Sequence, residues 1–152
     1  MDYITRFKNQ THNYLDAIKS CNHSLNEEMM IAIQMLNLQS GDILLNAFSG
    51  GIPLDEYIDK SLNVKYLKYD TNKEFAKNNI IHYTIDKIPV ESNSVDKIIC
   101  LATLHHFNDA ERSILYKEFY RILKKGGILR IIVPDLDLYL SNMIDSTKDK
   151  EF

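Results

Sequence analysis

From Gly41 onward, the 152-residue chain alternates short apolar runs with stretches of helical spacing. The first run, at 43–47, is almost continuously apolar, which is typical of a strand buried on both faces. Four more strands are predicted, at 64–69, 80–84, 95–101 and 128–133. Repeated β-α units favour parallel strands that helices cover. The sequence therefore predicts an α/β fold with an open, mostly parallel sheet of about five strands and helices on both faces.

Two helices are expected before this sheet. Apolar residues recur at roughly helical spacing within 3–18, and a second apolar run follows a polar interruption. Ser24 followed three residues later by Glu27 has the form of a capping box. This pattern predicts that the second helix covers about 25–38.

Two further helices are expected in the second half of the chain. The apolar positions within 114–123 form a helical stripe that Asp109 can cap at its start. Gly126 and Gly127 follow the stripe, and glycine there permits the left-handed conformation of a helix C-cap. The last helix is expected at 136–144, before a polar tail.

The length fits one domain covering 1–152. Within it we expect a helical N-terminal cap at 1–40, the α/β core at 41–135, and a terminal helix and tail at 136–152.

Composition and motifs exclude several classes of function. The charges, with a net value of −3, are spread along the chain without a basic stripe, so we expect no nucleic-acid partner. No apolar run approaches membrane-spanning length, so we expect no membrane partner. Cys21 and Cys100 form no pair or metal-ligand pattern, which predicts free thiols in the cytoplasm and no metal site. The G-x-G-x-x-G turn of dinucleotide-binding dehydrogenases is absent.

The loop after the first strand is the first candidate site, because open parallel sheets bind ligands beyond the carboxyl ends of their strands. Its small residues would let the backbone approach a ligand closely. The alternative is that its two glycines only build a tight turn. The candidate residues are Asn46, Ala47, Phe48, Ser49, Gly50 and Gly51.

Polar residues after the next three strands extend this candidate site. Asp70 can accept hydrogen bonds from ribose hydroxyls or, alternatively, cap a following helix. Asp86 can receive an adenine amino group or lie in a solvated turn. His105 and His106 follow the fourth strand, where a histidine can act as a general base or be structural.

Three segments in the second half of the chain carry a family resemblance: 88–96 (IPVESNSVD), 104–107 (LHHF) and 118–127 (EFYRILKKGG), followed by Val-Pro-Asp at 133–135. In order and spacing these segments resemble the class I S-adenosylmethionine-dependent methyltransferases of the type 11 kind. The resemblance covers roughly 41–135 and implies a Rossmann-like core.

The resemblance also implies S-adenosylmethionine as cofactor and methyl transfer to a small-molecule acceptor. The loop 46–51 would hold the methionine moiety and Asp70 the ribose. The adenine would lie against Ile85 and Asp86, while Leu101 and Ala102 would touch the cofactor through their backbone. His106 is the candidate for removing a proton from an acceptor hydroxyl, and the family needs no metal.

Two departures from the family pattern support an alternative. Phe48 stands where the family has the first glycine of its loop, so its side chain must either point into the core or occupy ligand space. The elements that complete the family's sheet after the fifth strand are missing, so we expect an exposed sheet edge, open to a homodimer or a partner chain. The alternative is a catalytically inactive methyltransferase-like domain that acts as a binding or regulatory partner.

Overall fold

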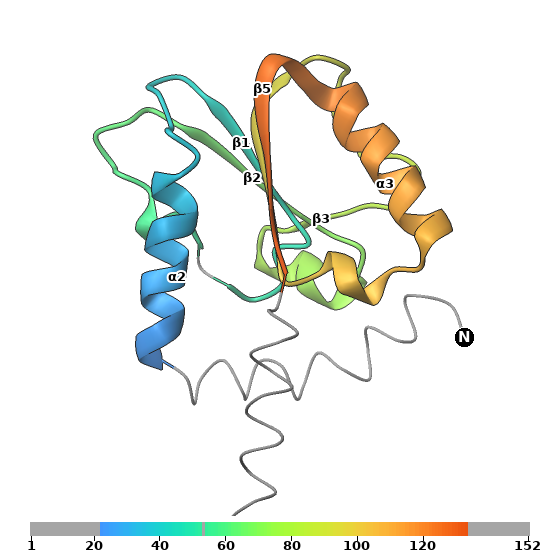
Figure 1. Cartoon of the computed structure of the whole chain (residues 1–152), viewed down its shortest axis with the longest axis horizontal. Coiled ribbons are helices and arrows are strands. Elements are labelled where there is room, and N and C mark those ends of the chain that lie inside the picture. Colours follow the sequence, from blue (N-terminus) through green and yellow to red (C-terminus); the bar gives the residue numbers. More distant parts are fainter. Residues whose placement is uncertain (1–21, 53, 134–152) are drawn as a thin grey trace, which may run out of the picture.

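The centre of the computed structural model, which describes residues 22–52 and 54–133, is a five-stranded sheet (Figure 1). The strand order is β3-β2-β1-β4-β5, and all neighbouring strands are parallel. The strands are β1 (Ile43–Ala47), β2 (Lys65–Asp70), β3 (Ile81–His82), β4 (Val95–Leu101) and β5 (Leu123–Ile132). This open sheet confirms the predicted α/β, Rossmann-like class.

The two long helices cover opposite faces of the sheet, as predicted (Figure 1). The helix α2 (Asn22–Gln34) lies on one face and α3 (Asp109–Ile122) on the other. Three short 3-10 helices follow β1, β2 and β4: η1 (Leu54–Tyr57), η2 (Lys73–Asn78) and η3 (Leu104–His106). The helices expected at 3–18 and 136–144 lie outside the described residues, so the division of the chain into cap, core and tail stays a prediction.

Each face of the sheet carries its own hydrophobic core. In β4, Ile98 packs with Leu115 and Phe119 of α3, whereas its neighbour Ile99 belongs to the core beneath α2. All four of these apolar residues are fully buried. Burying such a side chain stabilises the fold by about 1.5–3 kcal/mol. The central strands are apolar on both faces because both faces are covered.

The helix α2 differs from its predicted bounds. It begins at Asn22 and ends at Gln34, instead of covering 25–38. Ser24 therefore lies within the helix, and the capping box predicted there is wrong. The chain turns soon after the helix at Asn37, whose φ of 48° lies in the left-handed region that asparagine tolerates.

The helix α3 is capped by Asn108, not by Asp109 as predicted. The Asn108 side-chain oxygen accepts a hydrogen bond from the Glu111 backbone N–H at 3.0 Å, and the Glu111 carboxylate accepts one from the Asn108 N–H at 2.8 Å. These reciprocal bonds form a capping box. The helix ends at Ile122, because Leu123 is already extended and begins β5.

Gly126 and Gly127 lie inside β5 and do not end the helix, which corrects the prediction. The pairing of β4 with β5 shifts register between Val95 and Lys97, so the glycines belong to a local irregularity of the strand. Gly126 has a φ of 82°, which favours glycine. A Cβ on Gly127 would lie 2.8 Å from the Asp96 carbonyl oxygen. The pair is therefore needed by the strand.

The strand β3 is shorter than the predicted 80–84, because only Ile81 and His82 pair with β2. Thr84 forms an antiparallel bridge with Lys87, which turns the chain away from the sheet.

Candidate functional site

The loop after β1 begins with Phe48, whose backbone φ of 61° is in the left-handed region. A bulky residue adopts this conformation rarely. Its side chain is only 6% exposed and packs against Tyr83 and Phe107, with ring centroids 5.6 Å and 5.1 Å away. Of the two arrangements that the sequence left open, the structure therefore shows the benzyl group in the core. Aromatic pairs at such distances add about 0.5–1.5 kcal/mol each, which offsets the backbone strain.

Two polar side chains are buried in or beside this loop. The Asn46 side-chain amide donates a hydrogen bond to the Tyr66 hydroxyl at 2.8 Å. The Ser49 hydroxyl is buried and has no hydrogen-bond partner within the described residues. A buried hydroxyl without a partner costs about 1–3 kcal/mol, so Ser49 offers a group that a ligand can satisfy.

Asp70 ties the β1 loop to the end of β2. One carboxylate oxygen accepts a hydrogen bond from the Gly50 N–H at 2.9 Å, and the other accepts one from the Asn72 N–H at 2.8 Å. Burial raises the pKa of Asp70, and the bonds from Asn72 and Gly50 oppose that rise. The residue that caps η2 is Asn72, which accepts a hydrogen bond from the Glu74 N–H. The helix cap considered for Asp70 therefore belongs to Asn72.

Ile85 and Asp86 lie in the segment after β3. The Ile85 side chain is buried in the core beneath α3, whereas Asp86 is exposed. A hydrogen bond from the Thr84 side chain lowers the pKa of the Asp86 carboxyl. Asp86 is therefore accessible to solvent, with an ionised carboxylate at neutral pH, which fits either of the two settings that the sequence offered.

The carboxyl end of β4 contributes a second strained turn. Leu101 is buried, and Ala102 has a φ of 45°. The Ala102 N–H donates a hydrogen bond to the Ile132 carbonyl at 2.8 Å, and the Thr103 hydroxyl donates one to the Leu101 carbonyl at 2.6 Å. Strained residues of this kind cluster at functional sites.

The two histidines follow this turn in η3, with ring centroids 3.9 Å apart. Partial burial lowers the pKa of His105, so its ring is neutral near pH 7. The His106 backbone N–H donates a hydrogen bond to the Thr103 carbonyl. The next residue, Phe107, contacts Phe48, so η3 lies beside the β1 loop.

The predicted residues after β1, β2 and β4 therefore meet at one edge of the sheet, through the Gly50–Asp70 and Phe48–Phe107 contacts. Asp86, in the segment after β3, lies near α3: its charge raises the pKa of Glu118 slightly, against the stronger opposing effect of Arg121. Tyr83 and Phe107 were missed by sequence reasoning. The available signal was the large residue at position 48, which needs aromatic or aliphatic neighbours.

A parallel sheet with this strand order, and with loops that meet beyond the carboxyl ends of its central strands, defines a Rossmann-like domain with a ligand site at that edge. Residues 55–131 match the family described as "Methyltransferase domain". The chain therefore belongs to this methyltransferase family, and membership implies S-adenosylmethionine as its cofactor. The match begins after the altered loop at 46–51. Among curated proteins, none matches the chain by sequence.

Solved structures share the fold. A protein of Methanococcus maripaludis, described as an S-adenosylmethionine-dependent methyltransferase, superposes with a TM-score of 0.65 at 20% identity over 99% of this chain. A Haloferax volcanii protein described as a methyltransferase, in complex with the Trm112 methyltransferase activator, gives 0.66 at 17% identity over 82% of this chain. The [4+2]-cyclase SpnF gives 0.59 at 16% identity over 69% of this chain. This chain spans 74%, 58% and 43% of those three proteins, respectively.

The residues at the sheet edge fit the implied cofactor. Ser49 presents its buried hydroxyl, and Asp70 presents a carboxylate whose two oxygens each retain acceptor capacity. A Cβ built on Gly50 would meet no atom of the described residues within 4 Å, so these residues leave room directly beside Gly50. Within 22–52 and 54–133, no three His, Cys, Asp or Glu side chains gather as a metal site requires. In the same ranges, no helix is both long and apolar enough to cross a membrane.

Proposed function

We propose that this domain binds S-adenosylmethionine at the carboxyl ends of β1, β2 and β4 and transfers its methyl group to a small-molecule acceptor. The observation that carries the proposal is the link between Asp70 and Gly50, because it places a buried carboxylate directly beside the glycine turn. In this proposal the loop 46–51 holds the methionine moiety, and the Asp70 carboxylate accepts hydrogen bonds from the ribose hydroxyls. Ile85 and Asp86 form the adenine side, and Leu101 and Ala102 present their backbone.

The position of Phe48 supports this reading. Its benzyl group is buried against Tyr83 and Phe107. The substitution of the family's glycine therefore leaves the space beside Gly50 clear of that side chain.

The cofactor supplies an electrophilic methyl group on a sulfonium, which an acceptor displaces in line. The task of the chain is to align that acceptor and exclude water. His106, in η3 beside the β1 loop, takes the proton from an acceptor hydroxyl in this proposal. The neutral ring of its neighbour His105 adds no charge that would oppose the protonation of His106.

Calorimetric titration of the purified chain with S-adenosylmethionine and S-adenosylhomocysteine tests the proposal. We expect micromolar affinity, which corresponds to about −8 kcal/mol. Asp70→Asn should weaken binding by about tenfold or more, because a charge-assisted hydrogen bond to the ribose is lost. Asp59→Asn is the matched control, since Asp59 is exposed on the loop before β2. A folded chain that binds neither ligand would overturn the proposal.

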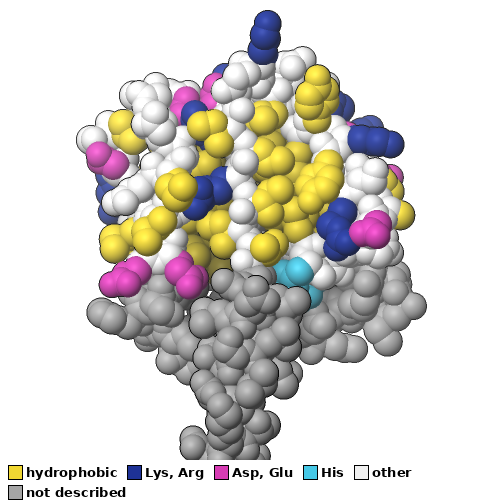
Figure 2. All heavy atoms as spheres, in the orientation of Figure 1, with side chains coloured by type: hydrophobic (Ala, Val, Ile, Leu, Met, Phe, Trp, Pro, Cys, Tyr) yellow, Lys and Arg dark blue, Asp and Glu magenta, His cyan; other side chains and the backbone are white. Residues whose placement is uncertain are grey.

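The second candidate is an inactive methyltransferase-like domain that binds a partner protein or a second copy of itself. The observation that favours it is the edge strand β5, which pairs only with β4 within the described sheet and exposes Ile131 and Val133 nearby. Figure 2 shows hydrophobic side chains on both sides of this strand. A protein partner is also present in the Haloferax structure.

The variant Phe48→Gly separates the two candidates. If the unaltered chain binds no cofactor and Phe48→Gly does, the side chain closes the site and the second candidate is supported. If both bind with similar affinity, the benzyl group lies outside the ligand space and the enzyme proposal stands.

A further inference from the structure

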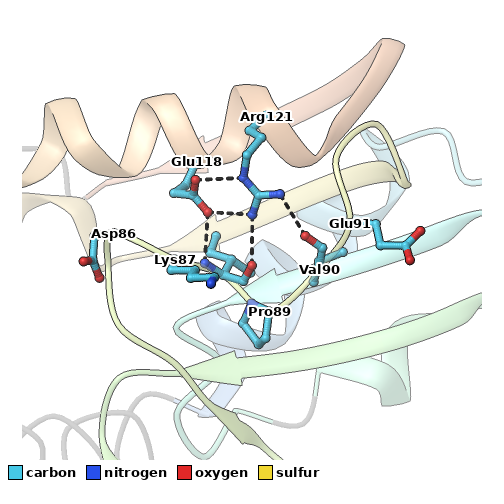
Figure 3. Close-up of a pocket in the computed structure, with 8 residues that line it drawn as sticks. Asp86, Lys87, Pro89, Val90, Glu91, Glu118 and Arg121 are labelled. Atoms are coloured by element: carbon cyan, nitrogen blue, oxygen red, sulfur yellow. Dashed lines mark hydrogen bonds and ion pairs between the residues drawn. The ribbon is translucent and has the colours of Figure 1, made fainter.

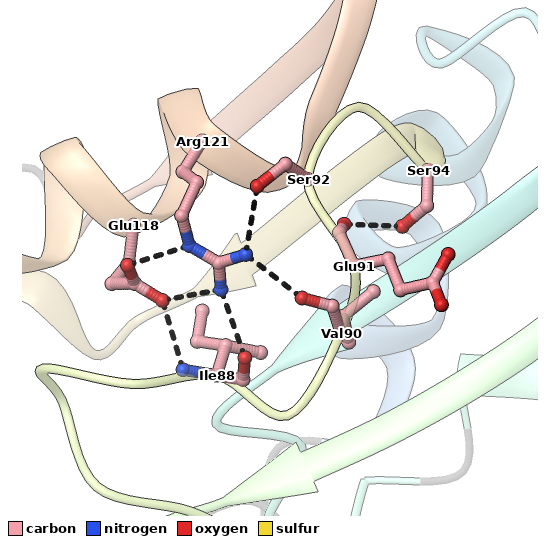
Figure 4. Close-up of polar contacts among 7 residues, drawn as sticks. All are labelled: Ile88, Val90, Glu91, Ser92, Ser94, Glu118 and Arg121. Carbon is pink, nitrogen blue, oxygen red and sulfur yellow. Dashed lines mark hydrogen bonds and ion pairs between the residues drawn. The ribbon is translucent and has the colours of Figure 1, made fainter.

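The segment that joins β3 to β4 is held against α3 by two side chains of that helix. The segment covers 83–94 and contains no helix, although connections between parallel strands usually do. Glu118 and Arg121 project from α3 onto this segment (Figures 3 and 4). We call this pair the clamp.

Arg121 uses all five of its guanidinium N–H groups within the clamp. Nε donates to Glu118 at 2.8 Å, and Nη2 donates to Glu118 at 2.7 Å and to the Ile88 carbonyl at 2.9 Å. Nη1 donates to the Val90 carbonyl at 2.9 Å and to the Ser92 hydroxyl at 3.3 Å (Figure 4). Only a planar guanidinium offers this many donors in a fixed geometry.

Glu118 also binds the segment directly. Its carboxylate also accepts a hydrogen bond from the Ile88 N–H at 3.0 Å. Ile88 is therefore fixed through both its N–H and its carbonyl. The hydrogen bond from Arg121 lowers the pKa of Glu118, so the carboxylate is ionised at neutral pH. The Glu118 side chain is largely buried, whereas that of Arg121 is 32% exposed, so solvent screens the ion pair only in part.

A shallow pocket of about 550 Å³, open to solvent, adjoins the clamped segment and is lined by residues 86–91 together with Glu118 and Arg121 (Figure 3). The segment is therefore not packed on all sides. On its other side, Ile85 and Ile88 are buried in the core beneath α3, and the clamp adds to that anchoring by binding the backbone of Ile88 and the carbonyl of Val90.

We propose that Glu118 and Arg121 are positioning residues for the adenine side of the cofactor site. Ile85 and Asp86 lie three and two residues before Ile88, so the backbone fixed by the clamp also sets where these two residues stand. The inference rests on the proposed function and assigns it a further pair of residues, which do not touch the cofactor themselves.

The test compares affinities for two ligands: S-adenosylhomocysteine and its inosine analogue, which lacks the adenine amino group. Arg121→Ala should bind S-adenosylhomocysteine about tenfold more weakly, because the competent segment conformation would be populated only about a tenth of the time. The preference for adenine over hypoxanthine should also fall. Arg121→Lys should behave like Arg121→Ala, since a single ammonium cannot reach Glu118 and both carbonyls at once.

Lys124→Met is the matched control. It breaks another ion pair, in which the Lys124 ammonium lies 2.8 Å from the Asp96 carboxylate at the opposite end of the strands from the site. It should lower the unfolding temperature while both affinities and their ratio remain unchanged. Thermal unfolding and circular dichroism show that each variant is folded at the titration temperature. Glu118→Gln, which keeps the side-chain volume, replaces Arg121→Ala if that variant does not fold, and should lower the same ratio.

Each outcome decides one question. If the unaltered chain binds neither ligand, the proposed function is wrong and this inference is wrong with it. If the unaltered chain binds and the clamp variants keep its affinity and its adenine preference, only this inference is overturned. A loss of affinity of the same size in Lys124→Met would likewise overturn it, because the effect would then follow general stability.

Discussion

Phe48 illustrates how a large residue can occupy a glycine position with its side chain buried in the core. The left-handed backbone costs about 1–2 kcal/mol for a residue with a Cβ. Burial of the ring beside Tyr83 and Phe107 returns more than this, because a fully buried large apolar side chain contributes about 1.5–3 kcal/mol before its aromatic contacts are counted. The same packing brings the loops after β1, β3 and β4 together.

Asp70 makes the proposed cofactor affinity depend on pH. Burial raises its pKa in the ligand-free protein, so the carboxylate becomes protonated at a higher pH than an ordinary aspartate. A protonated Asp70 accepts fewer hydrogen bonds from a ribose. The affinity for S-adenosylhomocysteine should therefore fall on acidification from pH 7, beginning above the usual aspartate range, and the fall should be absent in Asp70→Asn. Titrations in a series of buffers measure it.

The free energy of unfolding of the ligand-free protein should depend on Asp70 in the opposite direction, and so should rise as the pH falls. Because the folded pKa is raised, the ligand-free protein gains stability from Asp70 as pH falls through that pKa toward the unfolded value. An affinity that stays constant down to the ordinary aspartate range would contradict the proposed contact with the ribose.

At the scale of the strands, the two glycines of β5 are needed for different reasons. Gly127→Ala should lower the free energy of unfolding by about 1–3 kcal/mol, since the new methyl group would lie 2.8 Å from the Asp96 carbonyl and from Leu123. Gly126→Ala should cost about 1–2 kcal/mol through its φ of 82°, although a Cβ there meets open space among the described atoms. Urea unfolding measures both. Gly126→Asn should recover part of the loss, whereas a neutral Gly127→Ala would contradict the close contact.

The same region shows what the sequence could predict. The strands at 43–47 and 95–101 were predicted with their observed bounds, because the apolar residues that mark them are neighbours in the sequence. The end of α3 was not, since Leu123 becomes extended by pairing with Val95 across the sheet. No local pattern contains that partner.

The candidate site could likewise be predicted from the sequence only in part. Its loops were predicted because the carboxyl ends of parallel strands share one edge of the sheet. The contact of Phe48 with Phe107 joins residues distant in sequence, so spacing could not reveal it. The clamp lay within the recognised segment 118–127, but its partners are mainly backbone groups of another segment, which carry no sequence signal.

Across the whole molecule, cofactor binding should protect backbone amides at the carboxyl ends of the strands more than those at the amino ends. A ligand at 100 times its dissociation constant stabilises the folded state by about 2.7 kcal/mol, which slows every amide that exchanges through global unfolding. Amides that exchange through local opening slow further only where the ligand contacts the chain. Hydrogen exchange with and without S-adenosylhomocysteine should therefore show extra protection at 46–51 and 101–103. Amides around Asp96 and Lys124, at the amino ends of β4 and β5, should show only the global effect. Extra protection along β5 instead, rising with protein concentration and independent of ligand, would place the binding surface at that edge strand and favour the partner-binding alternative.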